Sequence, residues 1–250
     1  MSKPTAERIR VVGDVSDLSF RERVSSQARQ LGLLGWVKLM EEGSLCTHVE
    51  GEGPAIGELV ASFRSMAEVA SVSERPQRVE GHEQFAIRGV PAGAFVVQEH
   101  QAASRHFDVR LEVGDATRSW TVPKGPSMDP SVKRFAIEVR DDSLGRADFE
   151  GPAGDGALIV WDRGAYEQGG RVPWPEALDR GHAVFVLHGE KLQGGFALQR
   201  TRGGEKPRWL MIKRRDEYAR PESDIVAERP ESVQSGLTLD GLLTAMQRRR

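Results

Sequence analysis

Two histidines, an aspartate and an arginine lie in one short stretch of the chain, and together they could hold a divalent metal ion beside a phosphate. From His106 the chain reads His-Phe-Asp-Val-Arg-Leu-Glu, so a β-strand would place His106, Asp108 and Arg110 on one face. Same-face neighbours on a strand lie roughly 7 Å apart, close enough for an imidazole and a carboxylate to bind one ion. His100, which follows an apolar run, could complete the site from an adjacent strand.

The ligand types indicate which ion would bind and what it would do. Nitrogen and carboxylate ligands suit Mn²⁺, Zn²⁺ or Fe²⁺ better than Ca²⁺, and three protein ligands leave positions open for water and substrate. Arg110 carries a planar, permanently charged guanidinium that can bind a phosphate through two hydrogen bonds. These residues predict a catalytic metal centre that acts on phosphoesters. The alternative is that the histidines and the aspartate are ordinary hydrogen-bonded residues.

Long motifs extend this pattern along the chain. The run VVQEHQAASRHFDVRLE is followed in order by SWTVPKGPSMDP, IVWDRG, LHGEKLQGGFALQRTR and WLMIKRRDEYAR. Over residues 94–220 they resemble the 3'-phosphoesterase module of bacterial DNA ligase D. The resemblance implies a Mn²⁺ ion, with Zn²⁺ or another divalent metal as the alternative, and its ligands in the H-x5-H-x-D motif would be His100, His106 and Asp108. It also implies that Arg110 contacts the phosphate, and we expect Lys124, in the second motif, to bind substrate with it.

The family implies an activity as well as a site. Its members trim 3' ends during DNA repair, removing a terminal ribonucleotide and then the 3'-phosphate to leave a hydroxyl that can be ligated. By resemblance, this chain would be a hydrolase that acts on the 3' ends of DNA or DNA/RNA strands, with a separate DNA ligase and an end-binding protein as candidate partners. The alternative is a non-catalytic module that binds DNA ends or accompanies a ligase.

One segment departs from the family pattern. Where the family has a histidine and, four residues on, a tyrosine, this chain reads RDDSLGRADFEG, which places Asp142 and Arg146 at those positions. A group that could stabilise charge on a transferring phosphoryl group is thereby replaced by a carboxylate that would repel it. We include Asp142 and Arg146 among the candidate catalytic residues and expect a weakened site. The alternative is that they form a surface ion pair without a catalytic role.

The first ninety residues show a different order of elements. The periodicity predicts a strand at 8–15, a helix at 20–31, a hairpin at 36–49, a helix at 56–66 and a closing strand at 84–88. This order is typical of a ferredoxin-like βαββαβ domain. The turn-rich residues 89–93 predict its end.

The residues of this part resemble acylphosphatases. FRERVSSQARQLGLLGWV and EQFAIRG are similar to the first-helix signature and the last strand of that family, and the resemblance covers residues 6–89. The family binds phosphate with a glycine-rich loop and the arginine of FR, and an asparagine after WV positions water. Here Arg21 is kept, but Asp17 stands in the loop and Leu39 stands at the asparagine position. A carboxylate opposes anion binding and leucine cannot orient water, so we expect a degenerate site at Arg21 and Leu39, and acylphosphatase activity is the least favoured function.

Residues 91–220 contain short, turn-punctuated runs with scarcely a helix. Strands are predicted at 95–99, 106–113, 119–122, 134–139, 157–161, 183–188, 195–200 and 209–213. The predicted fold is therefore α+β, with a ferredoxin-like domain at 1–90, a β-rich, barrel-like phosphoesterase domain at 91–220, and a polar tail at 221–250 with a short terminal helix. We expect His188 to be structural, and four tryptophans to lie in the core rather than to stack on bases: Trp120, Trp161, Trp174 and Trp209.

Charge and composition limit the partners. The formal net charge is −2, so any contact with nucleic acid must come from a local cluster rather than from overall attraction. The candidates for such a cluster are Arg200, Arg202, Lys206, Arg208, Lys213, Arg214 and Arg215. The alternative is that these residues form an ordinary solvated face. The charged N-terminus and the absence of a long apolar run predict a cytoplasmic protein without a membrane partner, and the single Cys46 excludes an internal disulfide.

Overall fold

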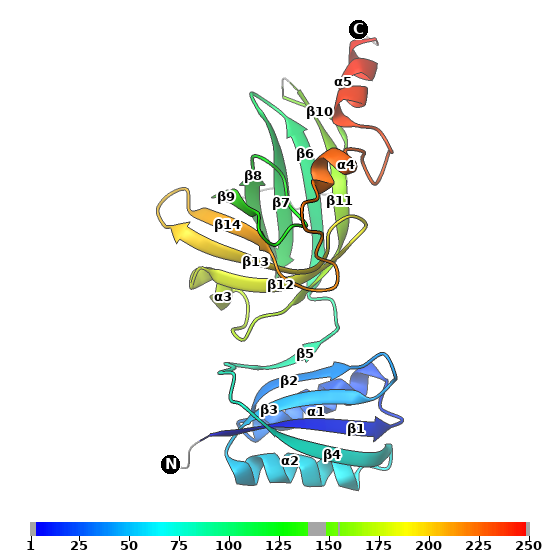
Figure 1. Ribbon diagram of the computed structural model, residues 1–250, viewed down its shortest axis with the longest axis vertical. Coiled ribbons are helices and arrows are strands. Elements are labelled where there is room, and N and C mark those ends of the chain that lie inside the picture. Colours follow the sequence, from blue (N-terminus) through cyan, green and yellow to red (C-terminus); the bar gives the residue numbers. More distant parts are fainter. Residues whose placement is uncertain (1–3, 140–148, 155, 249–250) are drawn as a thin grey trace. The chain divides into compact units, whose positions relative to one another are not determined.

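The chain divides into two compact units (Figure 1). The computed structural model describes residues 4–139, 149–154 and 156–248. Unit 1 comprises Met1–Val90 with Arg171–Pro173, and unit 2 comprises Pro91–Gly170 with Trp174–Arg250. Each unit has its own sheet, so each is described by itself.

Unit 1 is a five-stranded sheet with two helices. Its elements are β1 (Thr5–Gly13), α1 (Leu18–Gln30), β2 (Leu34–Leu39), β3 (Leu45–Gly51), α2 (Gly53–Ser65), β4 (Val69–Gln77) and β5 (Phe85–Arg88). The strand order is β4-β1-β3-β2-β5, antiparallel except for the parallel pair of β2 and β5. The predicted ferredoxin-like order is confirmed, but its closing strand is β4. The segment that the sequence assigned to that role is an additional edge strand, β5.

Both helices cover one face of this sheet. Apolar side chains on α1 and α2, including Phe20, Val24, Leu59 and Phe63, pack in one cluster with sheet residues such as Val49. Helical spacing of these side chains is what turns them to the same side. The opposite face of the sheet therefore carries the alternate residues of β1, β2 and β3.

Unit 2 is an antiparallel barrel. Its strands are β6 (Gly93–Gln101), β7 (Arg105–Val113), β8 (Ala116–Val122), β9 (Lys133–Val139), β10 (Gly151–Ala153), β11 (Gly156–Gln168), β12 (His182–Gly189), β13 (Gln193–Arg202) and β14 (Arg208–Lys213). The order is β10-β11-β12-β13-β14-β9-β8-β7-β6, and the pairing of β11 with β6 closes the circle. All eight predicted strands and the barrel are confirmed, and β10 is an addition to them. The four tryptophans of this unit are buried, as the sequence predicted.

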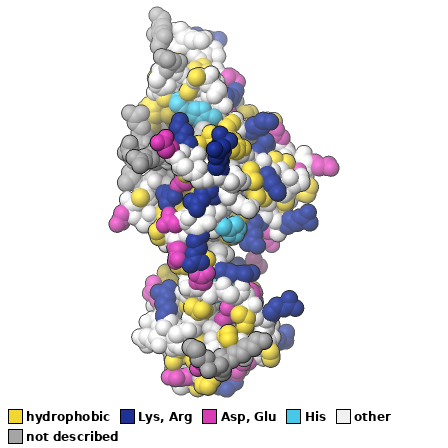
Figure 2. All heavy atoms as spheres, turned by 90° about the vertical axis from the view of Figure 1, so that its left-hand side faces the viewer, with side chains coloured by type: hydrophobic (Ala, Val, Ile, Leu, Met, Phe, Trp, Pro, Cys, Tyr) yellow, Lys and Arg dark blue, Asp and Glu magenta, His cyan; other side chains and the backbone are white. Residues whose placement is uncertain are grey.

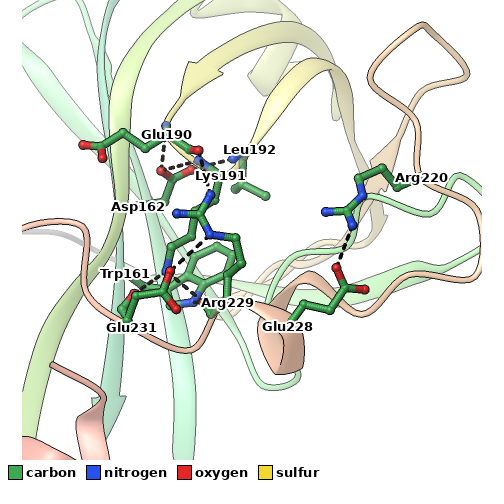
Figure 3. A network of polar contacts seen from close by, with 9 residues as sticks. All are labelled: Trp161, Asp162, Glu190, Lys191, Leu192, Arg220, Glu228, Arg229 and Glu231. Carbon is green, nitrogen blue, oxygen red and sulfur yellow. Dashed lines mark hydrogen bonds and ion pairs between the residues drawn. The ribbon is translucent and has the colours of Figure 1, made fainter. Parts of the chain in front are cut away.

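The C-terminal segment packs against the barrel. It contains α4 (Ile225–Glu228) and α5 (Leu239–Gln247), and a short helix, α3 (Glu176–Asp179), precedes β12. Leu239 of α5 lies in a cluster with Ala157 and Ile159 of β11. A polar network adds to this contact, because Lys191 donates a hydrogen bond from Nζ to the carbonyl of Arg229 at 2.9 Å (Figure 3). None of the helices in the described ranges has the length and apolar character needed to cross a membrane.

Candidate metal centre

The predicted metal ligands come from one hairpin of the barrel. Strands β6 and β7 pair in a register that places His100 opposite His106, Gln98 opposite Asp108 and Val96 opposite Arg110. Because paired residues share a face of the sheet, His100, His106 and Asp108 lie on the same side. The two imidazole rings are 5.0 Å apart between centroids, edge to face. The structure therefore brings together the residues that the alternation of the sequence singled out.

The ligand atoms of these three residues fit a cation. One nitrogen or carboxylate oxygen from each lies within 4.8 Å of the others, and all three side chains are half-buried. His100 Nε2 is buried and has no hydrogen-bond partner among the described residues. A buried nitrogen of this kind is usually satisfied by a ligand, a water or an ion. Two imidazoles and a carboxylate are a donor set for a borderline divalent metal ion.

Neighbouring groups orient two of the three ligands. His106 Nδ1 lies 2.9 Å from the carbonyl oxygen of Ser104, to which it can donate, and this leaves Nε2 to face Asp108 Oδ2 at 3.6 Å. Thr121 of β8 donates to Asp108 Oδ1 at 2.7 Å, so Oδ2 keeps its lone pairs for another partner. Hydrogen bonds that fix a ligand's tautomer and direction are typical of metal sites.

The charges of the site favour a bound cation. Burial raises the pKa of Asp108, but interactions with His106 and Thr121 outweigh it and hold that pKa below its ordinary value. The interaction with Asp108 raises the pKa of His106, against the opposing effect of burial. The carboxylate is therefore ionised at neutral pH and attracts positive charge, whether a proton on His106 or a metal ion.

The sequence predicted four further site residues, namely Arg110, Lys124, Asp142 and Arg146. Arg110 is half-buried on the same face of β7, next to Ser119 of β8 in the register. Lys124 is exposed in the turn that follows β8. Asp142 and Arg146 lie outside the described residues. The catalytic and binding roles of these four residues stay predictions.

Two other polar residues of this unit, His188 and Lys213, contact carboxylates. His188 is exposed and contacts Glu167, with 2.6 Å between Nε2 and Oε1, so it takes no part in the metal centre. Lys213 does not belong to the predicted basic surface, because it is buried and its Nζ lies 2.6 Å from the Asp216 carboxylate. The other members of that cluster are exposed. Figure 2 shows Lys, Arg and His side chains together on one face of this unit.

The sequence did not single out the residues that support the ligands. Thr121 lies on β8 directly beside Asp108 in the register, and Gln98 lies opposite Asp108 on β6. Gln98 is buried and donates to the carbonyl of Phe149 at 3.2 Å. The alternation of β8 could have identified Thr121, since a polar residue there must face the same side as the predicted ligands once β7 and β8 pair.

The predicted degenerate site in unit 1 has a different character. Asp17 caps α1, and its carboxylate accepts a hydrogen bond from the backbone N–H of Ser19 at 2.7 Å. A carboxylate therefore occupies the helix N-terminus that would otherwise attract an anion. Arg21 is only 8% exposed, and its Nε is buried without a hydrogen-bond partner among the described residues. Leu39 ends β2 and is half-buried.

Two family models match the chain. The DNA Ligase D 3'-phosphoesterase domain matches residues 98–200, and the acylphosphatase domain matches residues 7–87. Both matches fall on the parts of the chain in which the sequence motifs were found. The candidate metal ligands lie inside the first of them.

Individual relatives agree with these matches. The chain is 45% identical over 154 residues to the multifunctional non-homologous end joining protein LigD of Pseudomonas aeruginosa, which covers 58% of this chain and 18% of that protein. It is 32% identical over 200 residues to LigD of Mycolicibacterium smegmatis, covering 74% of this chain and 24% of that protein. It is 36% identical over 86 residues to the acylphosphatase of Thermotoga petrophila, covering 33% of this chain and 96% of that protein. The chain thus spans less than a quarter of the length of these LigD relatives and nearly all of that acylphosphatase.

Proposed function

Since this chain belongs to the DNA ligase D 3'-phosphoesterase family over residues 98–200 and to the acylphosphatase family over residues 7–87, we propose that it processes the 3' ends of DNA or DNA/RNA strands in DNA repair. The proposed reaction depends on a divalent metal ion, with Mn²⁺ as the first candidate. One observation carries the proposal. Two histidines and an aspartate share a face of the β6–β7 hairpin with an arginine two residues further along, within the matched range.

Each residue of the candidate metal centre would have a separate role. His100, His106 and Asp108 would hold the ion, and the ion would supply positive charge to a phosphoryl oxygen as a Lewis acid. Arg110 would bind a second phosphate oxygen and offset the charge that builds up there. Thr121 would keep the Asp108 carboxylate turned toward the ion.

Exposed basic side chains of the β13–β14 hairpin would bind the nucleic acid backbone. This group is Arg200, Arg202, Lys206 and Arg208. Such contacts give affinity without sequence selection, which suits an enzyme that must accept any 3' end. The names of the LigD relatives place them in non-homologous end joining, and we propose that a DNA ligase and an end-binding protein act together with this chain.

The test is an end-processing assay. Purified protein with Mn²⁺ is incubated with primer-templates that end in a 3'-ribonucleotide or a 3'-phosphate. We expect release of the ribonucleoside and then of phosphate, and a loss of more than about 100-fold in rate for His106→Ala, since a missing ligand costs more than a missing neighbour of a ligand. His182→Ala is the matched control, because His182 is an exposed histidine on β12 of the same barrel.

Metal binding is measured in parallel. Titration calorimetry should detect Mn²⁺ binding to the wild type and to His182→Ala, and much weaker binding to His106→Ala. Equal binding by the wild type and His106→Ala would refute the assignment of the metal ligands. The absence of both products, with DNA-end binding retained, would favour a different function.

That second candidate function is a module that binds DNA ends or accompanies a ligase without turnover. The observation in its favour is the presence of Asp142 and Arg146 where the family has histidine and tyrosine. Replacing both with the family residues should raise the rate if the site is a weakened enzyme. A double variant as inactive as the wild type would support the binding module.

A further inference from the structure

A second cluster of potential metal ligands lies in unit 1. One ligand atom each from His48, Glu80 and His82 lies within 4.8 Å of the others. His48 is on β3, and the other two lie in the segment that connects β4 to β5. The two clusters in the described part of the chain together contain four of the six histidines of the protein.

His48 lies on the sheet face opposite the helices. It pairs with Arg8 of β1 and with Trp36 of β2, so these side chains share a face, and its ring stacks on that of Trp36 with centroids 6.2 Å apart. The side chain of His48 is 0% exposed. Its Nε2 lies 2.8 Å from Glu50 Oε1. Donation from Nε2 to this carboxylate selects the tautomer in which Nδ1 carries a lone pair.

His48 Nδ1 is buried and has no hydrogen-bond partner among the described residues. An imidazole that donates one nitrogen to a carboxylate and leaves the other unsatisfied has the arrangement of a metal ligand with an orienting partner. A hydrogen-bonded structural histidine would instead have both nitrogens satisfied or one exposed to water.

The connecting segment is fixed over His48 by the same glutamate. Glu50 accepts hydrogen bonds from the backbone N–H groups of Glu80, Gly81 and His82. Gly81 has a φ of +78°, a left-handed conformation that favours glycine, and this turn directs three successive N–H groups at one carboxylate. The segment therefore holds its two side chains beside His48, with the His48 and His82 ring centroids 5.4 Å apart.

We propose that His48, Glu80 and His82 bind a divalent cation of the Zn²⁺ class, which links β3 to the segment before β5. Two imidazoles and one carboxylate are a set of ligands that Zn²⁺ uses, and they leave a fourth position for water. Tetrahedral Zn²⁺ holds its ligand atoms about 3.3 Å apart. The ligand atoms, which lie within 4.8 Å of one another, would therefore have to move closer when an ion binds. The Glu80 side chain is 40% exposed, so it can move and it leaves a route for the ion, whereas both histidines are buried.

The test measures Zn²⁺ binding in the full chain after the other cluster has been removed. The background is His100→Ala with His106→Ala, so that the barrel site cannot account for the signal. Titration calorimetry should then show one Zn²⁺ per chain. Adding Glu80→Gln should weaken binding at least tenfold, and adding His82→Asn should abolish it. Glu58→Gln is the matched control, because it removes the same charge from an exposed position on α2.

A second readout covers the case in which His82→Asn does not fold. Zn²⁺ should raise the melting temperature of the background protein relative to a chelator, by an amount that grows with the logarithm of the Zn²⁺ concentration. Glu80→Gln should reduce this shift and Glu58→Gln should not. Failure of the background protein to bind Zn²⁺, or equal affinity in Glu80→Gln and Glu58→Gln, would overturn the proposal. Neither result depends on the phosphoesterase activity.

Discussion

Asp162 should make the barrel more stable at mildly acidic pH than at pH 7.5. This carboxylate is 0% exposed and accepts hydrogen bonds from the backbone N–H groups of Glu190, Lys191 and Leu192, at 3.0, 3.0 and 2.8 Å (Figure 3). Burial raises the pKa of Asp162 to about 6, from an ordinary value of 3.8, although the backbone hydrogen bonds favour the charged form. The folded protein therefore binds this proton more tightly than the unfolded chain does.

The size of the effect follows from the difference between the two pKa values. A difference of about 2 pH units at 1.36 kcal/mol per unit gives roughly 3 kcal/mol. Because the pKa is higher in the folded state, the free energy of unfolding rises as the pH falls from about 6 toward about 4. Above pH 7 the carboxylate is charged in both states, and its contribution no longer changes.

The assay compares the wild type with Asp162→Asn, whose side chain does not titrate. Urea unfolding is followed by tryptophan fluorescence, since four of the five tryptophans lie in the barrel unit. The free energy of unfolding of the wild type minus that of Asp162→Asn should rise by roughly 2 kcal/mol between pH 7.5 and pH 4.5, and it reaches the full value of about 3 kcal/mol only below the ordinary pKa of 3.8. Asp115→Asn, at an exposed carboxylate, should show no such change.

Two outcomes would contradict this reasoning. A difference that stays constant across the pH range would mean that the pKa of Asp162 is the same in the folded and unfolded states. A difference that shrinks as the pH falls would mean that the three backbone N–H groups outweigh burial and lower that pKa. The metal affinity of the barrel site should be unaffected by Asp162→Asn, because Asp162 pairs with Val97 on β6 and not with a predicted ligand.

Three further predictions concern the sites themselves. Thr121→Val should lower Mn²⁺ affinity by about 10- to 100-fold in calorimetry, since it removes the hydrogen bond that orients Asp108, and an unchanged affinity would contradict this. The wild type should cleave 3'-ribonucleotide diesters faster than 3'-phosphate monoesters, because a carboxylate at position 142 would repel the monoester dianion more. Asp142→His should raise the rate on 3'-phosphate ends by tens-fold to a hundred-fold. Equal wild-type rates on both kinds of end would refute this prediction. Hydrolysis of benzoyl phosphate should be at background in the wild type, and a rate that Arg21→Ala abolishes would show that unit 1 is active.

Local patterns in the sequence predicted most of the barrel and the arrangement of its candidate metal ligands. The alternation from His106 to Glu112 placed alternate residues on opposite faces, and β7 has that pattern of burial. His100 and His106 are only six residues apart, so a tight hairpin is enough to bring them opposite each other. Strand periodicity and hairpin register are both short-range properties, which is why the sequence determines them.

The same reasoning failed where burial did not follow the usual pattern. Strand β4 is an edge strand that is mostly exposed and contains Pro76, so it lacks the apolar alternation by which strands are recognised. Lys213 was among the residues that the sequence offered as candidates for a basic cluster. It shares its strand face with Trp209 and Met211, which are buried, and this alternation could have corrected the assignment.

The two candidate metal sites differ in how far apart their ligands lie in the sequence. His100, His106 and Asp108 span nine residues of one hairpin. His48 and His82 are 34 residues apart, and they meet only because the segment after β4 crosses to β5 at the opposite edge of the sheet. No local periodicity relates those two histidines. The compact site has a corresponding weakness, because a slip of one residue in the β6–β7 register would turn His106 and Asp108 toward the core face. The neighbouring pairings of β6 with β11 and of β7 with β8 prevent that slip, so closure of the barrel is itself a condition for the candidate metal centre.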